Sequence, residues 1–292
     1  MQIRKAVLPV AGLGTRILPA SKVIPKEMLP LVDKPTLQYI VEEAVEAGIE
    51  EIIFVISQTK QSISDHFKPF PELEEVLQRK GKRQELQELR KVQSMATYKS
   101  VLQPEPLGLG HAVLCAKELV GDEPFIVMLG DDLVDPETPV LPKMNEIFEQ
   151  YGSSVLSLFH APPDQIPSLG IASVEELGND VVKVTHLVEK PPLEEAPSDL
   201  AVAGRYILTP DIFALLEKTP PGRGGEIQIT DAIEMQARAG HCYGIEFNGI
   251  RYDTGTPLGL LTTSISYGLK RPDIAPALKT FMRQALEGAG AK

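Results

Sequence analysis

The 292-residue sequence contains no tryptophan and only two cysteines. Cys115 and Cys242 are far apart in the chain and stand in apolar segments. A disulfide framework is therefore not expected, and we interpret both as buried thiols in a reducing compartment. No apolar run is long enough to span a membrane, and the first residues show neither the apolar core nor the cleavage pattern of a signal peptide. The sequence predicts a soluble, cytoplasmic protein.

Basic residues are the minority among the charged ones. Lysine and arginine number 29 against 40 aspartates and glutamates, which gives a net charge of −11. Such a chain repels nucleic acid and anionic membrane surfaces unless it carries a concentrated basic patch, and its few basic clusters alternate with glutamates. We expect neither nucleic acid nor membrane as a partner. A small phosphorylated ligand stays compatible, because it needs only a few cations in one cleft.

Apolar segments of strand length alternate with amphipathic segments in the first half of the chain. Segment 36–48 places its apolar residues on one face of an expected helix, which Gly48 can close. Strands that follow one another without tight hairpins indicate a Rossmann-like α/β fold, with a mixed, mostly parallel sheet flanked by helices. The expected strands are residues 6–10, 52–56, 99–102 and 125–129, and a further helix is expected at 111–119.

The second half changes character. Strand-like segments are separated by turns rich in proline and glycine, which favours an antiparallel or mixed region. Helices are expected again towards the end of the chain. The expected strands are residues 155–159, 171–174, 181–188 and 201–208, and the expected helices are 210–216, 230–238, 257–269 and a final one after residue 272.

A glycine-rich turn follows the first expected strand, in Ala11-Gly12-Leu13-Gly14-Thr15-Arg16. Glycine lets backbone N–H groups approach phosphate oxygens closely, because it carries no Cβ and tolerates positive φ. Arg16 and, ten residues later, Lys26 add a fork of donors and a point charge that phosphates bind. The dinucleotide fingerprint would require a third glycine where Ile17 stands, and the phosphate-loop motif G-x-x-x-x-G-K-[ST] is absent.

Two further segments place charged side chains at the ends of expected strands. Gly130-Asp131-Asp132 follows strand 125–129, where open α/β sheets bind ligands, and Asp131 is a natural first ligand for Mg²⁺. Asp132 we interpret as a cap or a hydrogen-bond partner of the loop. Glu189-Lys190 is followed by two prolines, which end strand pairing and present both side chains in a defined direction.

The whole string around the first turn resembles the signature of the sugar-nucleotide pyrophosphorylases. G-x-G-T-R followed by P-K is the family's pattern, and I-P-K-E-M-L-P-L-V-D-K-P is similar to the bacterial UTP–glucose-1-phosphate uridylyltransferases. The resemblance implies UTP and glucose 1-phosphate as substrates, Mg²⁺ as cofactor and a homo-oligomer, a dimer or a tetramer. It also implies a nucleotide-binding half at residues 1–150, a sugar-phosphate-binding half at 151–271 and a C-terminal helix at 272–292.

The resemblance also assigns roles by position. Gln103 corresponds to the family's base-contacting residue, and its amide could both donate to O4 and accept from N3–H of uracil. The nucleotide-binding positions are Ala11, Gly12, Gly14, Gln103 and Gly108. The sugar-phosphate positions are Gly170, Glu189, Lys190, Ala203 and Gly204. The catalytic cations are Arg16, Lys26 and Lys190, and the metal ligands are Asp131 and Asp253.

Some residues depart from the family pattern or carry no role in it. Leu169 replaces the family's usual tyrosine before Gly170. We interpret His111, at the start of an expected helix, and segment 224–231 as structural. The implied reaction is an in-line displacement in which the anionic phosphate oxygen of the sugar attacks the α-phosphorus of the nucleotide, so no covalent intermediate or general base is needed.

Three alternatives stay open at this point. A dehydrogenase would need the third glycine that Ile17 replaces. A non-catalytic sugar-nucleotide-binding regulator would share the fold without the cations and Asp131. The third is a thymidylyltransferase that uses dTTP, or an enzyme for another hexose 1-phosphate. The choice between uracil and thymine depends on room for one methyl group, which is worth only about 1–3 kcal/mol.

Overall fold

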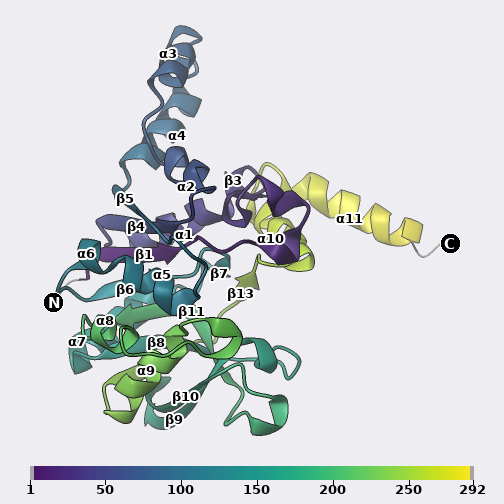
Figure 1. Ribbon diagram of the computed structural model, residues 1–292. Helices are drawn as coiled ribbons and strands as arrows, with labels where there is room; N and C mark the ends of the chain where they lie inside the picture. Colours follow the sequence, from purple (N-terminus) through teal and green to yellow (C-terminus); the bar gives the residue numbers. More distant parts are fainter. Residues whose placement is uncertain (1–2, 290–292) are drawn as a thin grey trace.

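The computed structural model of the protein describes residues 3–289. Within that range one mixed sheet of nine strands runs through the molecule, in the order β5-β4-β1-β6-β11-β8-β12-β10-β9 (Figure 1). The first four strands along the sheet are parallel to one another. They are β5 (Thr97–Leu102), β4 (Glu51–Ile56), β1 (Lys5–Pro9) and β6 (Phe125–Met128).

The other part of the sheet is mainly antiparallel. β11 pairs antiparallel with both β6 and β8, and β12 is parallel to β8. The expected division at residue 150 falls close to the end of α7 (Leu141–Tyr151), yet the sheet continues across it because β11 pairs with β6. The strands of this part are β8 (Ser154–His160), β9 (Gly170–Gly178), β10 (Val181–Glu189), β11 (Leu200–Leu208) and β12 (Cys242–Glu246).

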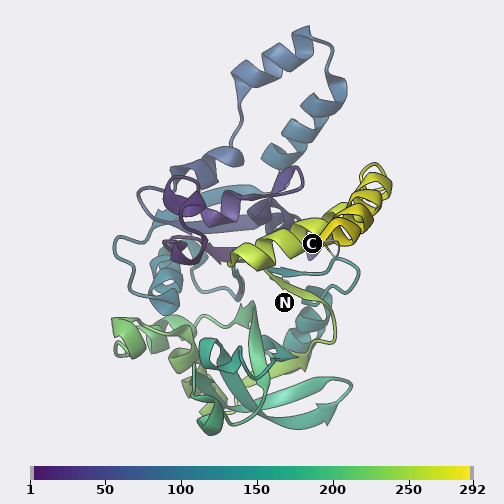
Figure 2. The same cartoon turned by 90° about the vertical axis from the view of Figure 1, so that its right-hand side faces the viewer.

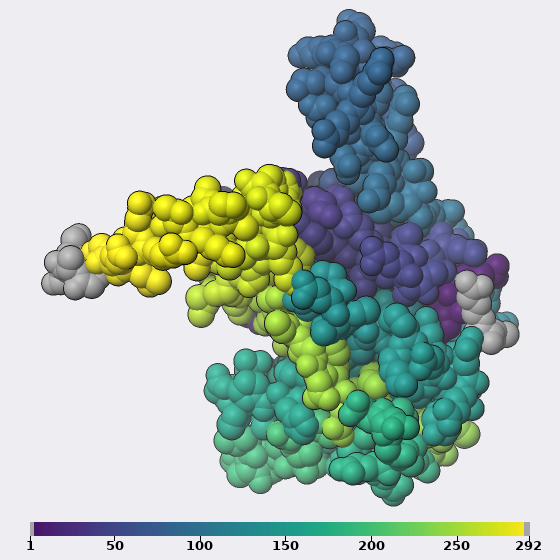
Figure 3. All heavy atoms as spheres, turned by 180° about the vertical axis from the view of Figure 1, so that it is seen from behind, coloured from purple at the N-terminus to yellow at the C-terminus, as the bar shows by residue number. Residues whose placement is uncertain are grey.

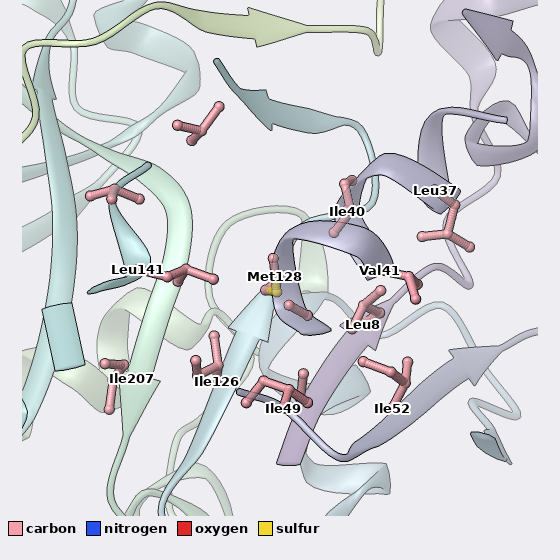
Figure 4. Packing of buried hydrophobic residues seen from close by; sticks show 14 of the residues in the cluster. Leu8, Leu37, Ile40, Val41, Ile49, Ile52, Ile126, Met128, Leu141 and Ile207 are labelled. Carbon is pink, nitrogen blue, oxygen red and sulfur yellow. The ribbon is translucent and has the colours of Figure 1, made fainter. Parts of the chain in front are cut away.

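Helices cover both faces of the sheet and create two apolar cores. One core contains Leu8, Ile40 and Ile126 and lies under α1 and α7 (Figure 4). The other contains Val7, Val113 and Ile233 and lies under α5, α8 and α9. The helices are α1 (Thr36–Glu46), α2 (Gln61–His66), α5 (Leu109–Cys115), α6 (Lys117–Val120), α7 (Leu141–Tyr151), α8 (Ile212–Leu216) and α9 (Ile229–Arg238).

Two small antiparallel ribbons lie outside the main sheet. One joins β7 (Asp132–Val134) to β13 (Arg251–Asp253), and the other joins β2 (Pro30–Leu31) to β3 (Lys34–Pro35). The sequence analysis missed all four strands because each has only two or three residues, too few for an alternating pattern. It also missed β12, where Gly244 interrupts the apolar residues.

Two helical segments extend away from the body. The hairpin of α3 (Pro71–Arg79) and α4 (Arg83–Ser94) rises above the sheet and contains no buried residue (Figures 1 and 2). α10 (Pro257–Lys270) packs near the β2–β3 ribbon, and α11 (Ala275–Ala289) continues from it as a separate projection (Figure 3). Among the described residues, no helix combines the length and the apolar character that crossing a bilayer requires.

Candidate active site

The glycine-rich turn predicted from the sequence follows β1 directly. The backbone N–H of Val10 donates to the carbonyl oxygen of Val55 on β4 (2.9 Å), so the turn begins at the carboxyl end of two parallel strands. Gly14 has a φ of 66°, a conformation that L side chains rarely adopt. It leads into the short 3-10 helix Thr15–Ile17, which carries Arg16. A second 3-10 helix, Lys26–Met28, begins with Lys26.

Two cations and two carboxylates converge beside this turn. The Lys26 ammonium forms an ion pair with Oδ2 of Asp131. The Arg16 guanidinium lies between two acidic residues, with Nη2 3.6 Å from Oδ2 of Asp131 and Nη1 3.6 Å from Oδ2 of Asp253. Four residues that the sequence analysis singled out, spread over most of the chain, therefore form one cluster, which we call the charge cluster: Arg16, Lys26, Asp131 and Asp253.

The pairing of β7 with β13 explains why two distant aspartates meet. Thr254, just after β13, donates from both its backbone N–H (2.8 Å) and its hydroxyl (2.9 Å) to the carbonyl oxygen of Asp131. Gly255 then packs into the charge cluster, where a Cβ atom would lie 2.5 Å from Nη2 of Arg16 and from Oδ2 of Asp131. Any larger residue at this position would push the charged groups apart.

The cations of the charge cluster stabilise the ionised form of Asp131. Burial by itself would raise the pKa of the Asp131 carboxyl, but the Lys26 ammonium and then the Arg16 guanidinium outweigh this effect and hold the pKa below its ordinary value. Asp131 is therefore ionised at neutral pH.

The chemistry of the donor set in the charge cluster suits a divalent cation. Asp131 and Asp253 both pair with the Arg16 guanidinium, and they are the two carboxylates that would hold such an ion. Mg²⁺ is commonly bound by one or two carboxylates and completes its shell with phosphate oxygens and water. Within residues 3–289 no group of three or more acidic, histidine or cysteine side chains could hold a metal by itself. The pair suits an ion that arrives with a phosphate ligand.

A cavity of about 360 Å³ opens beside the glycine-rich turn, and we call it the turn cavity. Five sequence-predicted positions line it: Ala11, Gly12, Gly14, Gln103 and Gly108. Gln103 follows β5, and its backbone N–H donates to the carbonyl oxygen of Ile56 (2.8 Å). The side-chain nitrogen of Gln103 already contacts the Gly108 carbonyl oxygen and His111 Nδ1, each at 3.1 Å. Both hydrogens of this amide are thus directed at groups of the protein, and the contact of Gln103 with a base stays a prediction.

A second cavity of about 220 Å³ lies next to β9, β10 and β11, and we call it the sheet cavity. Gly170, Glu189 and Lys190, three of the predicted sugar-phosphate positions, line it. The Lys190 ammonium is 3.2 Å from Glu189, and the Lys190 backbone has a φ of 47°. A non-glycine residue in this region is uncommon and is often found at functional sites. Glu189 also accepts a hydrogen bond from the Thr230 hydroxyl (2.5 Å).

Two predicted positions do not line either cavity. Ala203 and Gly204 lie in β11, where the Gly204 carbonyl oxygen accepts from Leu129 (3.0 Å), whereas Val202 and Tyr206 of the same strand face the sheet cavity. Leu169 lines the sheet cavity, at the position where the family usually has tyrosine.

Several lining residues had no predicted binding role. Asp132, which the sequence analysis interprets as a cap or a hydrogen-bond partner, lines the sheet cavity together with Arg251, and the Arg251 guanidinium donates to Oδ2 of Asp132 (2.9 Å). Glu226 lines both cavities and stands between them. Arg251 could have been suspected from its place in the segment Arg251-Tyr252-Asp253, but Glu226 has no local signal apart from its position in segment 224–231.

The chain is similar to known proteins over most of its length. A family model described as nucleotidyl transferase matches residues 5–268. The UTP–glucose-1-phosphate uridylyltransferase of Bacillus subtilis (strain 168) is 46% identical over 285 residues, which cover 98% of this chain and 98% of that protein. A protein of the same name from Staphylococcus epidermidis (strain ATCC 12228 / FDA PCI 1200) is 46% identical over 283 residues, covering 97% of this chain and 98% of that protein.

Solved structures are similar in fold over most of the chain. The chain superposes on the UTP-bound UGPase from Acinetobacter baumannii with a TM-score of 0.88 and 42% identity, covering 96% of this chain and 98% of that one. A UDP-glucose pyrophosphorylase complexed with UDP-glucose gives a TM-score of 0.83 and 41% identity, covering 92% of this chain and 100% of that one.

Proposed function

This chain belongs to the nucleotidyl transferase family, and we propose that it transfers a uridylyl group from UTP to glucose 1-phosphate, giving UDP-glucose and pyrophosphate. The relatives named above carry this activity in their names, and the similarity extends over nearly the whole of both chains. The observation that carries the proposal is the charge cluster. Arg16 directly follows the turn that lines one cavity. Asp131 and Asp253 stand next to the β7–β13 pairing, whose Asp132 and Arg251 line the other cavity.

The two cavities suit the two substrates. The turn cavity offers backbone N–H groups of a glycine-rich loop and the Gln103 amide, which fits a nucleoside triphosphate. The sheet cavity offers Glu189 for sugar hydroxyl groups and Lys190 for a phosphate. In this assignment residues 1–150 supply the nucleotide site apart from Glu226, and residues 151–271 supply most of the hexose site.

Positioning and charge account for the reaction. A phosphate oxygen of glucose 1-phosphate attacks the α-phosphorus of UTP, the bond to the β-phosphate bridging oxygen breaks, and pyrophosphate leaves with the bonding electrons. Arg16 and Lys26 bind the triphosphate and stabilise the charge that develops, while Lys190 orients the attacking phosphate. Mg²⁺, held by Asp131 and Asp253, would neutralise phosphate oxygens when bound.

A substrate grid tests the proposal. Pyrophosphate release is measured with UTP, dTTP, CTP and ATP against glucose 1-phosphate and other hexose 1-phosphates, with and without Mg²⁺. We expect the highest kcat/KM for UTP with glucose 1-phosphate and no turnover after chelation of divalent ions. Preference for dTTP would replace uridylyl by thymidylyl transfer. Binding of UDP-glucose without any pyrophosphate release would indicate a regulator and contradict the proposal.

The protein is further proposed to be a homo-oligomer, a dimer or a tetramer, that works in the cytoplasm. Cys115 and Cys242 are free thiols, which a reducing compartment preserves. Phe281 and Leu286 on α11 expose 66% and 74% of their surface. Large apolar side chains on a projecting helix are typical of a surface that another subunit covers.

A further inference from the structure

The side-chain amide of Gln103 is held in one orientation. Its Nε2 donates to the carbonyl oxygen of Gly108 (3.1 Å) and lies 3.1 Å from Nδ1 of His111. A backbone carbonyl oxygen can only accept a hydrogen bond, so the nitrogen of the amide must be on this side. The two hydrogens of the amide nitrogen are therefore both directed at groups of the protein itself.

The same contact defines the protonation of His111. Because the amide nitrogen can only donate, Nδ1 must offer a lone pair, and the proton of the neutral imidazole must be on Nε2. Nε2 in turn lies 3.9 Å from Sγ of Cys115, one helical turn further along α5. The start of α5 thus presents a histidine acceptor to Gln103 at a fixed distance.

The remaining polar atom of Gln103, Oε1, belongs to a side chain that lies beside the turn cavity. The residue lines that cavity, and its backbone is tied to β4. Among the described residues Oε1 has no hydrogen-bond partner, and it is not one of the unpaired oxygen atoms that are sealed from solvent. Towards a ligand, the amide is therefore an acceptor only.

We propose that His111 is a positioning residue that fixes the Gln103 amide so that the site selects pyrimidine bases carrying an N3–H, uracil or thymine, over cytosine. The inference rests on the proposed function, which places the base in the turn cavity. Uracil N3–H can donate to Oε1, whereas the N3 lone pair of cytosine would face another acceptor. Uracil and thymine share the N3–H, so His111 and Gln103 do not separate UTP from dTTP.

Two substitutions of the same shape test this role. His111→Asn keeps a side-chain oxygen near the place of Nδ1, and His111→Leu has a methyl group there. The ratio of kcat/KM for UTP to that for CTP is measured with glucose 1-phosphate for the parent and both variants. We expect His111→Leu to lower the ratio roughly fivefold to tenfold, as loss of one hydrogen bond does, and His111→Asn to retain most of it. Equal ratios in the two variants would reduce His111 to a steric role and overturn the proposal.

A double variant and a direct measurement complete the test. In a Gln103→Ala background, His111→Leu should not change the ratio further, because the amide that it orients is gone. Nitrogen NMR of the ring in the folded parent should show an unprotonated Nδ1 and a protonated Nε2, and the opposite tautomer would contradict the proposal whether or not the variants fold. A parent that releases no pyrophosphate would contradict the proposed function instead. The affinities of UTP and CTP for the same proteins, measured by calorimetry, would then show whether His111 favours UTP over CTP.

Discussion

Asp131 is the residue on which the charge cluster depends. Its carboxylate meets the Lys26 ammonium and the Arg16 guanidinium, and Thr254 holds its backbone. The two cations offset the burial of Asp131 and are themselves held in place by it. In the proposed reaction, loss of either cation should remove a preorganised charge from the place where phosphate charge develops.

Replacing Lys26 measures that contribution. Lys26→Met should lower kcat for pyrophosphate release by about 10²–10³, the size found when one preorganised electrostatic donor is removed. Lys22→Met is the matched control, because Lys22 is an exposed lysine of the same loop, and it should leave kcat unchanged. Steady-state kinetics with saturating UTP and glucose 1-phosphate would make the comparison. Equal activity of the two variants would remove Lys26 from the mechanism.

A buried ion pair lies directly behind the charge cluster. Lys60 donates to both oxygens of Glu27 (2.9 and 3.2 Å) and to the carbonyl oxygen of Val10 (2.8 Å), and the two side chains expose only 8% and 2% of their surface. Burial raises the pKa of the Glu27 carboxyl and lowers that of the Lys60 ammonium, and each partner opposes the shift in the other. The pair ties the Lys26 segment to the start of the glycine-rich turn.

Breaking this pair should cost stability. Lys60→Met is expected to lower the free energy of unfolding by about 3–5 kcal/mol, because it leaves the Glu27 charge buried without a partner. The double variant Lys60→Met with Glu27→Met should recover most of the loss. Lys82→Met removes an exposed pair with Glu85 and should have no measurable effect. Urea unfolding of the three variants checks these values, and a double variant no more stable than Lys60→Met would contradict the argument.

The sequence predicts those site residues that stand in short local motifs better than those that only the fold brings to the site. Arg16, Lys26 and Asp131 follow from a turn, a motif and a strand end that lie in short segments. Asp253 could be tied to Asp131 only through the resemblance, because the β7–β13 pairing that joins them has no local signal. Glu226 and Arg251 escaped notice, since their roles depend on two cavities that exist only in the folded chain.

At the scale of elements, the end of α10 is fastened to the β7–β13 ribbon by one carboxylate. Asp135 accepts two hydrogen bonds from the Lys270 ammonium (2.6 Å each), one from the Tyr252 hydroxyl (2.9 Å) and one from the Glu137 backbone (2.9 Å). Burial would raise the pKa of Asp135, but Lys270 and the other donors hold it below the ordinary 3.8. The contact holds α10, the helix that follows Asp253, in a fixed position relative to the β7–β13 ribbon.

This contact gives a pH-dependent prediction. A carboxyl whose pKa is lower in the folded state stabilises the fold fully above its unfolded pKa, and this contribution is lost as the pH falls through the folded pKa. Asp135→Asn should therefore lower the free energy of unfolding at pH 7 by roughly 1–3 kcal/mol. The difference in free energy of unfolding between the variant and the parent should become smaller below about pH 4. Asp122→Asn, at an exposed position, is the control. Denaturant unfolding between pH 3 and 7 tests this, and a difference independent of pH would contradict it.

The long elements could be predicted and the short ones could not. Apolar strands such as β4 and the amphipathic α1 have enough residues for a period to be recognised. The ribbons β2–β3 and β7–β13 do not, although one of them assembles the charge cluster. The place of β11 between β6 and β8 joins the two halves into one sheet, and this pairing is decided by tertiary packing rather than by any local pattern.

At the scale of the whole molecule, the proposed oligomer can be tested through substitutions on α11. Its exposed Phe281 and Leu286 should be covered in an oligomer, so Phe281→Ser with Leu286→Ser should shift the protein towards the monomer. Gln284→Ser on the same helix is the control and should leave the assembly unchanged. Light scattering after size-exclusion chromatography gives the masses. A monomeric parent would contradict the proposed oligomer, and an unchanged mass in the double variant would exclude α11 as its contact.

The account as a whole depends on two phosphate groups meeting between the two cavities, with a direct displacement at the α-phosphorus. The stereochemistry at that atom tests this most directly. One diastereomer of UTP carrying sulfur on the α-phosphorus is turned over with glucose 1-phosphate, and phosphorus NMR of the product gives its configuration. A single in-line attack predicts inversion. Retention would mean two displacements through a covalent nucleotidyl-protein intermediate, and it would contradict a mechanism built on positioning and charge alone.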